Sequence, residues 1–149
     1  AAVMSAVTQT YLLVLAQNFT ALAGGTAKTT PQNHAAASFT CKRLPIDNAI
    51  DWAASSARIF NLIRATGHPY SGATTTFAAR SLTVWAAERI PAKSYVGRVP
   101  GRVTEVLPGK GAVVLTGDGA LLVTRAQIEG GTETCAAETL DSISMTLGR

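Results

Sequence analysis

The sequence predicts an α+β fold in which an amphipathic helix is followed by a small antiparallel β-barrel. Within residues 50–73, Ile59, Leu62 and Ile63 are spaced so that they share one face of a helix. After this segment apolar and polar residues alternate, and short strands at the observed spacing fit a small barrel. The chain has 149 residues, of which 47% are hydrophobic and 15% are charged. This composition is typical of a globular protein rather than of a disordered one.

The first 23 residues form a segment without any charged side chain. Its larger apolar residues recur at helical spacing, and Gly24-Gly25 provides an end to the helix. A membrane span needs roughly 20 mostly apolar residues, whereas the longest unbroken apolar run here is residues 11–16. We therefore expect no membrane partner. A helix so poor in charge is unsuited to standing alone in water, and we expect it to pack on another surface.

Residues 26–46 have the composition of a connector. Thr29-Thr30-Pro31-Gln32-Asn33 is rich in turn-forming residues. Phe39 and Leu44 are expected to attach the connector to a core. The two cysteines, Cys41 and Cys135, lie far apart and outside any metal-ligand spacing, which favours free thiols and predicts no metal site.

The helix of residues 53–65 carries its polar residues opposite the apolar face. Arg58, Asn61 and Arg64 fall on this wetter side. Gly67 is expected to end the helix in the left-handed conformation, and Pro69 cannot continue it.

Four segments are expected to be strands: the alternating residues 81–86, 101–107 and 120–127, and residues 112–115, a short apolar run bounded by glycines. Asp118-Gly119 between the last two predicts a hairpin turn. Leu140, Ile143 and Leu147 are helically spaced, so residues 133–147 are expected to close the chain with a further helix.

Several short motifs, taken in order, resemble the C-terminal domain of the folate-dependent formyltransferases. This family includes methionyl-tRNA formyltransferase and the enzymes that N-formylate amino sugars. The resemblance runs from about residue 10 to 130, and Ser71 departs from it, because the family usually has Pro there. The motifs are Thr30-Pro31-Gln32 with Ala37-Ser38-Phe39, Asp51-Trp52, Ile59-x-x-x-Ile63-Arg64-Ala65, Gly72-Ala73, Pro100-Gly101-x-Val103 and Gly117-Asp118-Gly119-Ala120-Leu121.

The resemblance implies an OB-like barrel with the helix of residues 53–65 packed beside it. It implies that residues 1–25 are the terminal helix of an upstream catalytic domain, residues 26–49 a linker, and residues 50–149 the barrel domain. In this family an Asn, a His and an Asp of the upstream Rossmann-like domain catalyse, and that domain binds formyltetrahydrofolate. The chain starts at Ala1 without an initiator Met, so we expect a fragment, a cleaved product or a partly ordered larger protein.

The resemblance assigns no catalytic residue and no bound cofactor to this chain. The two histidines, His34 and His68, stand without a cysteine or carboxylate at ligand spacing, and no pair of carboxylates suggests acid–base chemistry. The expected partner is the upstream catalytic domain, in the same or another polypeptide, and the expected location is the cytoplasm.

The acceptor is expected to be a tRNA or a nucleotide-linked amino sugar, because in the tRNA enzyme this barrel holds nucleic acid through a basic surface. The net charge of +4 mildly favours anionic partners. Ordinary solvated charges are the alternative for these basic residues, which also include Arg89, Lys93 and Lys110. The candidate substrate-binding residues are Arg58, Arg64, His68, Arg80, Arg98 and Arg102.

Three aromatic residues, Tyr70, Trp85 and Tyr95, could stack bases, although core packing is favoured for Trp85. His68-Pro69-Tyr70 differs from the Trp-Pro turn common in the tRNA enzymes, which favours a sugar-type or other small-amine acceptor. The alternative function is a stand-alone OB-like module that binds RNA or a protein partner without catalysis.

Overall fold

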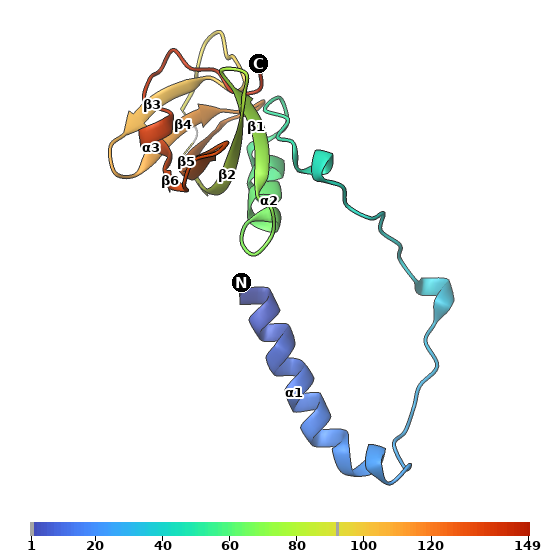
Figure 1. The fold of residues 1–149 in the computed structure, drawn as a ribbon. Helices are drawn as coiled ribbons and strands as arrows, with labels where there is room; N and C mark the ends of the chain where they lie inside the picture. The colour runs from blue at the N-terminus through green and yellow to red at the C-terminus, as the bar shows by residue number, and fades with distance from the viewer. Residues whose placement is uncertain (1, 92) are drawn as a thin grey trace. The chain divides into compact units, whose positions relative to one another are not determined.

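The computed structural model describes residues 2–91 and 93–149. The chain divides into two compact units, the first ending at Lys42 and the second covering Arg43–Arg149. The first unit consists of helix α1 (Ala2–Ala23) and a connector that contains one short 3₁₀ helix, η1 (His34–Ala36) (Figure 1). The predicted first helix is therefore confirmed.

The surface of α1 is apolar and is exposed within its own unit. In the part of the chain that the structure describes, no helix combines the length and the apolar character that a membrane crossing requires. Phe39, which was expected to attach the connector to a core, belongs to the first unit and is exposed within it. The exposed apolar side chains of α1 include Tyr11, Leu12, Leu15, Phe19 and Leu22.

The second unit is α+β, as predicted. Helix α2 packs mainly against β2 and covers one side of the sheet (Figure 1). The elements of this unit are η2 (Pro45–Asn48), α2 (Ser56–Thr66), β1 (Ala73–Phe77), β2 (Arg80–Arg89), β3 (Val103–Leu107), β4 (Gly111–Leu115), β5 (Ala120–Ile128), β6 (Thr134–Cys135) and α3 (Ala136–Thr139).

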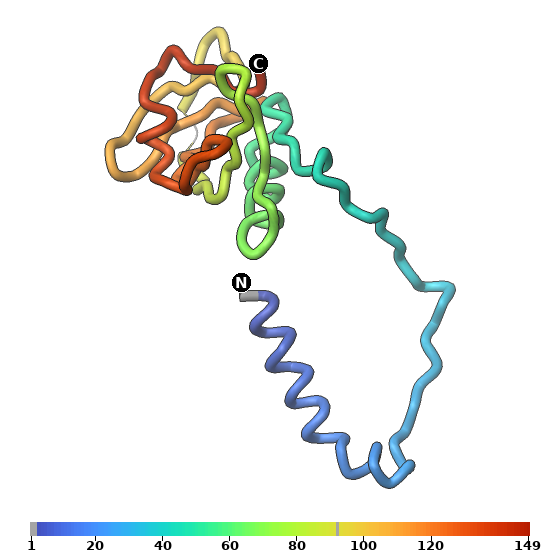
Figure 2. The backbone as a smooth tube through the Cα atoms, in the orientation of Figure 1, coloured from blue at the N-terminus to red at the C-terminus, as the bar shows by residue number. Residues whose placement is uncertain are grey.

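The six strands form one antiparallel sheet in the order β1-β2-β5-β4-β3, with β6 paired to β5. All four predicted strands are present, and Leu115 pairs with Ala120 across the predicted hairpin turn. The sheet is not closed, so the OB-like barrel is not confirmed. Instead, the C-terminal tail runs between the two outer strands: Thr146 forms a bridge with Arg102 beside β3, and the Gly148 amide donates to the Thr76 carbonyl of β1 (Figure 2).

The core lies between α2 and one face of the sheet. Ile59 and Ile63 of α2 are buried there, as their spacing predicts. β4 is buried along its whole length because its other face supports a second, smaller cluster. The main core also contains Trp52, Leu82, Val84, Val103, Leu121, Val123, Leu140 and Leu147.

Three further expectations are corrected. Residues 133–147 do not form one helix: α3 ends at Thr139, and Ile143 is 62% exposed. Leu147 is buried in the main core from an extended tail, which its amide attaches to the Gly101 carbonyl, and not from a helical face. Gly67 ends α2 with φ −60° and ψ 175°, in extended rather than left-handed backbone. Leu44 is 52% exposed and does not enter the core.

Candidate functional site

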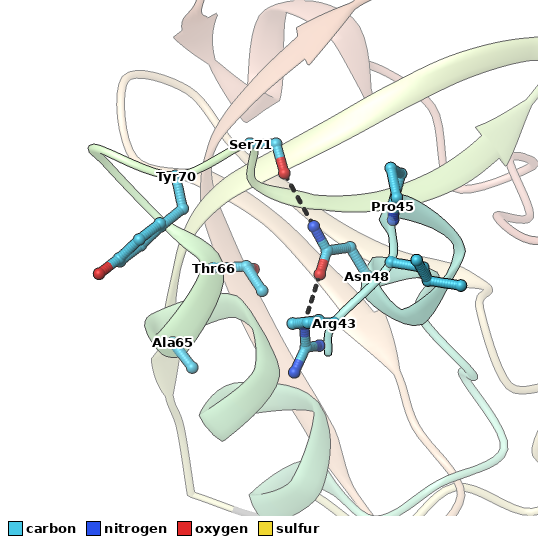
Figure 3. Close-up of a pocket in the computed structure, with 8 residues that line it drawn as sticks. Arg43, Pro45, Asn48, Ala65, Thr66, Tyr70 and Ser71 are labelled. Carbon is cyan, nitrogen blue, oxygen red and sulfur yellow. Dashed lines mark hydrogen bonds between the residues drawn. The ribbon is translucent and has the colours of Figure 1, made fainter. Parts of the chain in front are cut away.

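Two of the depressions around α2 lie at the C-terminal end of this helix. The larger is a cavity of about 440 Å³ between the segment that leads into η2, the end of α2 and the turn that follows it. Buried Asn48 lies at its centre: its side-chain amide donates to the Ser71 hydroxyl at 2.8 Å, and its carbonyl accepts from Arg43 Nε at 2.7 Å (Figure 3).

The polar groups around Asn48 are occupied by one another. Arg43 Nη2 also donates to the Asp47 carbonyl, and the Thr66 hydroxyl donates to the Leu62 carbonyl. Tyr70 points away from Asn48 at the rim (Figure 3). The hydrogen bonds around this cavity therefore hold three segments of the unit together. Few polar groups remain free for a ligand.

The second depression, which we name the α2–β2 groove, has a volume of about 250 Å³. It is lined by Phe60, Ile63, Arg64, Gly67, His68, Trp85, Ala86 and Ala87. α2 presents its residues here because Ser55 caps the helix, accepting from the Arg58 amide, and because Ile59 and Ile63 fix the buried face. On the other side, register shifts between Val84 and Ala87 change the path of β2 next to the groove.

Two guanidinium groups lie beside the ring of Phe60. Arg64 Cζ is 6.0 Å from the ring centroid, and Cζ of Arg89, at the end of β2, is 4.9 Å from it. Both arginines are exposed, and neither forms an ion pair with a carboxylate of residues 2–91 or 93–149. Each positive charge therefore lies near the same aromatic ring, Arg64 in the groove and Arg89 in a neighbouring depression.

His68 forms the opposite wall of the groove. Its ring stacks on Trp85 with centroids 4.0 Å apart and planes at 4°. Trp85 is itself held by a 3.0 Å hydrogen bond from Nε1 to the Gln127 side chain of β5. The stack therefore fixes the turn after α2 to the sheet.

Glu133 connects this wall to β5. One of its carboxylate oxygens lies 2.8 Å from His68 Nε2, and the other accepts from Arg125 Nε at 2.8 Å. The hydrogen bonds from Arg125 and then His68 lower the pKa of Glu133 from its usual value of 4.5. Glu133 is thus held as a carboxylate. Its hydrogen bond occupies Nε2 of His68, so this ring nitrogen is not free to bond to another group.

The groove combines groups that suit a planar or anionic ligand. Within the described residues, no hydroxyl or thiol forms a hydrogen bond with His68, so no activated nucleophile is assembled there. The same residues include no group of three potential metal ligands. The two guanidinium groups at Phe60 can attract an anion, and the exposed imidazole of His68 can stack on a planar ring.

The structure brings together only two of the six sequence-predicted candidates, Arg64 and His68. Arg58 is exposed on another side of α2, where it lines a different depression with Asp47 and Asp51. The other three candidates bind the chain's own atoms: Arg80 donates to the Glu129 carbonyl, Arg98 to the Gly119 carbonyl and Arg102 to the Thr146 hydroxyl.

Sequence reasoning missed Phe60 and did not select Arg89. The i,i+4 spacing of Phe60 and Arg64 was a usable signal, because such residues are neighbours on a helix. The approach of Arg89 depends on how β2 packs against α2. Trp85, expected in the core, is half-buried and forms the stack with His68.

Solved structures of HypX from Aquifex aeolicus share this fold. One variant superposes with a TM-score of 0.65 at 20% identity, over 89% of this chain and 23% of that chain. A second variant gives 0.64 at 20% identity, over 87% and 22%. HypX in complex with tetrahydrofolic acid gives 0.63 at 19% identity, over 87% and 22%. The chain therefore spans less than a quarter of the length of these proteins, and the likeness establishes the fold alone.

Residues 44–144 match the family model described as formyl transferase, C-terminal domain. This match contains α2, the whole sheet and the α2–β2 groove. The resemblance stated from the sequence motifs is thereby confirmed, over a range that starts and ends later than the motifs suggested. Because the match covers more than half of the chain, this protein belongs to the formyl transferase C-terminal domain family.

Proposed function

We propose that this chain is the accessory domain of a formyltetrahydrofolate-dependent formyltransferase. It would position an amine-bearing acceptor while a separate N-terminal domain binds formyltetrahydrofolate and transfers the formyl group. The observation that carries the proposal is the family match over residues 44–144. The HypX structure with tetrahydrofolic acid supports folate as the cofactor of the catalytic part.

The proposed domain arrangement follows from this role. Residues 1–25 would be the last helix of the catalytic domain, residues 26–49 the linker, and residues 50–149 the accessory domain. The uncharged, apolar surface of α1 supports this assignment, because such a helix is stabilised by packing on a partner surface. The proposed location is the cytoplasm.

The α2–β2 groove is the proposed contact with the acceptor, which would be a tRNA or a nucleotide-linked amino sugar. Arg64 and His68 line it, whereas Arg58 lies outside it and lines a different depression of the same helix. We do not assign acceptor contacts to Arg98 and Arg102, since their guanidinium groups are bonded to neighbouring loops.

The test is a formyl-transfer assay with the native polypeptide that contains this domain. Formyltetrahydrofolate would be supplied with either initiator tRNA or a nucleotide-linked amino sugar. One acceptor should be formylated, and R64Q and H68A should each raise its KM several-fold with kcat nearly unchanged, because a lost binding contact weakens ground and transition states equally. Formylation of neither acceptor would contradict the proposal.

A second candidate is a stand-alone module that binds RNA or a protein without catalysis. It is favoured by one observation: all the residues of the groove lie within the second unit. The intact mass of the native polypeptide discriminates the two functions. A product large enough to contain a catalytic domain supports the formyltransferase, and a product of this length alone supports the binding module.

A further inference from the structure

We propose that the α2–β2 groove, together with Arg89, binds a phosphate ester joined to a planar ring, which is the chemistry of one nucleotide unit. Arg64 and Arg89 would contact the phosphate, and His68 would stack on the base. The inference rests on the proposed function and deepens it, because it assigns the recognition of the acceptor to named residues that no family match assigns.

The phosphate end of the site is formed by the two arginines at Phe60. Each guanidinium lies within 6.0 Å of the same ring centroid, and the proposal places one phosphate group between the two. A guanidinium offers a planar set of donors that suits phosphate oxygens. Neither arginine has a carboxylate partner among the described ion pairs. Arg64 Nη2 makes one long hydrogen bond, 3.5 Å to the Asn61 side chain, and Arg89 lines a neighbouring depression with Asp118. Their other donors face an incoming anion.

The base end of the site is the outer surface of His68. One face of the imidazole is against Trp85, yet the side chain remains 64% exposed. A ligand ring can therefore continue the stack. Hydrogen bonds from Trp85 to Gln127 and from His68 to Glu133 hold the stack in place before a ligand arrives, and stacking of this kind accepts any base.

The size of the groove limits the ligand that it can hold. Its volume of about 250 Å³ lies below the range of about 300–1,000 Å³ typical of sites that enclose a drug-sized ligand. The groove therefore takes one nucleotide unit, and the rest of a longer ligand lies outside it. That unit could belong to a free or sugar-linked nucleotide, or to an RNA strand.

Calorimetric titration of the 149-residue chain tests the inference directly. Adenosine 5′-monophosphate should bind at least tenfold more tightly than adenosine or inorganic phosphate, because only the nucleotide engages both ends of the site. R64Q and R89Q should each weaken its binding at least fivefold. R58Q is the matched control, since Arg58 is on the same helix but outside the groove, and it should bind as wild type does.

A second variant separates the two ends of the site. H68A should weaken nucleotide binding several-fold but leave the binding of inorganic phosphate unchanged, and circular dichroism should confirm that each variant is folded. Absence of nucleotide binding, or equal binding by wild type and the R64Q/R89Q double variant, would overturn the inference.

The source of the nucleotide is resolved by competition. A short single-stranded RNA that displaces the mononucleotide and binds more tightly would identify RNA, and equal affinities would identify a small nucleotide. If nucleotide binding fails while R64Q still raises the acceptor KM in formyl transfer, the inference falls and the proposed function stands. If the nucleotide binds but neither acceptor is formylated, the proposed function falls and the site stands.

Discussion

His68 and Trp85 stack face to face, with ring centroids 4.0 Å apart and planes 4° from parallel. His68 lies in the turn that joins α2 to β1 and Trp85 lies in β2, so the contact holds that turn against β2. A double-mutant cycle of H68A and W85A should therefore give a coupling free energy of about 0.5–1.5 kcal/mol in urea unfolding. Y70A is the control, because Tyr70 lies in the same turn and is 56% exposed. A cycle of Y70A and W85A should give no coupling free energy. Additive effects of the two variants would mean that the stack contributes nothing.

In the hairpin between β1 and β2, a substitution is expected to stabilise the chain. Phe77 pairs with Arg80, and the two residues between them, Ala78 and Ala79, have φ of 49° and 60°. Such values are costly for alanine and normal for glycine, by about 1 kcal/mol per residue. A79G should thus stabilise the chain by about 1 kcal/mol.

The control for A79G is the same substitution in a helix. Ala57 lies in the first turn of α2, so A57G should destabilise by up to about 0.5–1 kcal/mol. Both free energies of unfolding come from denaturant titration. A loss of stability in A79G equal to that in A57G would contradict the left-handed turn.

The same turn explains why β1 could not be predicted from the sequence. Hairpin turns with two positive φ values are normally signalled by Asn or Gly, and here both positions are alanine. β1 itself reads Ala-Thr-Thr-Thr-Phe, which has no apolar alternation. The strands that were predicted, by contrast, alternate or are bounded by glycine.

The helical periodicity succeeded for α2 and failed for the C-terminal segment. Ile59 and Ile63 are buried on one face, because 11 continuous helical residues keep their spacing in register. In residues 133–147 the helix ends after one turn, so the spacing of Ile143 and Leu147 no longer places them on the same side. Spacing indicates burial only where the helix is long enough to impose it.

For the candidate site, the sequence could predict the charges but not their neighbours. Arg64 and His68 belong to the segment that was recognised, and they do line the groove. The roles of Arg98 and Arg102 could not be predicted, because their hydrogen-bond partners lie 21 and 44 residues away in the chain. Which arginines donate hydrogen bonds to the chain itself depends on contacts that form only in the folded protein.

The contrast between two isoleucines gives a direct measurement of the core. Ile63 of α2 is 2% exposed and packs in the main core, so I63A should cost about 2–5 kcal/mol of unfolding free energy through lost burial and a cavity. Ile143 is 62% exposed, and I143A should change stability by less than about 0.5 kcal/mol. A large loss of stability in I143A would mean that Ile143 is buried, as the predicted C-terminal helix requires.

The carboxylate of Glu133 should make the chain less stable in acid. Arg125 and His68 lower its pKa below 4.5 in the folded state, so the unfolded state binds more protons as the pH falls. The stabilisation is fully present above pH 4.5 and is lost as the pH drops through the folded pKa.

E133Q, which cannot ionise, should be less stable than wild type at neutral pH, and its stability should decline less steeply below pH 4.5. E138Q should keep the wild-type dependence, since Glu138 forms no ion pair within the described residues. Parallel curves for E133Q and wild type, measured by urea unfolding at each pH, would mean that the bridge from β5 to His68 does not stabilise the fold.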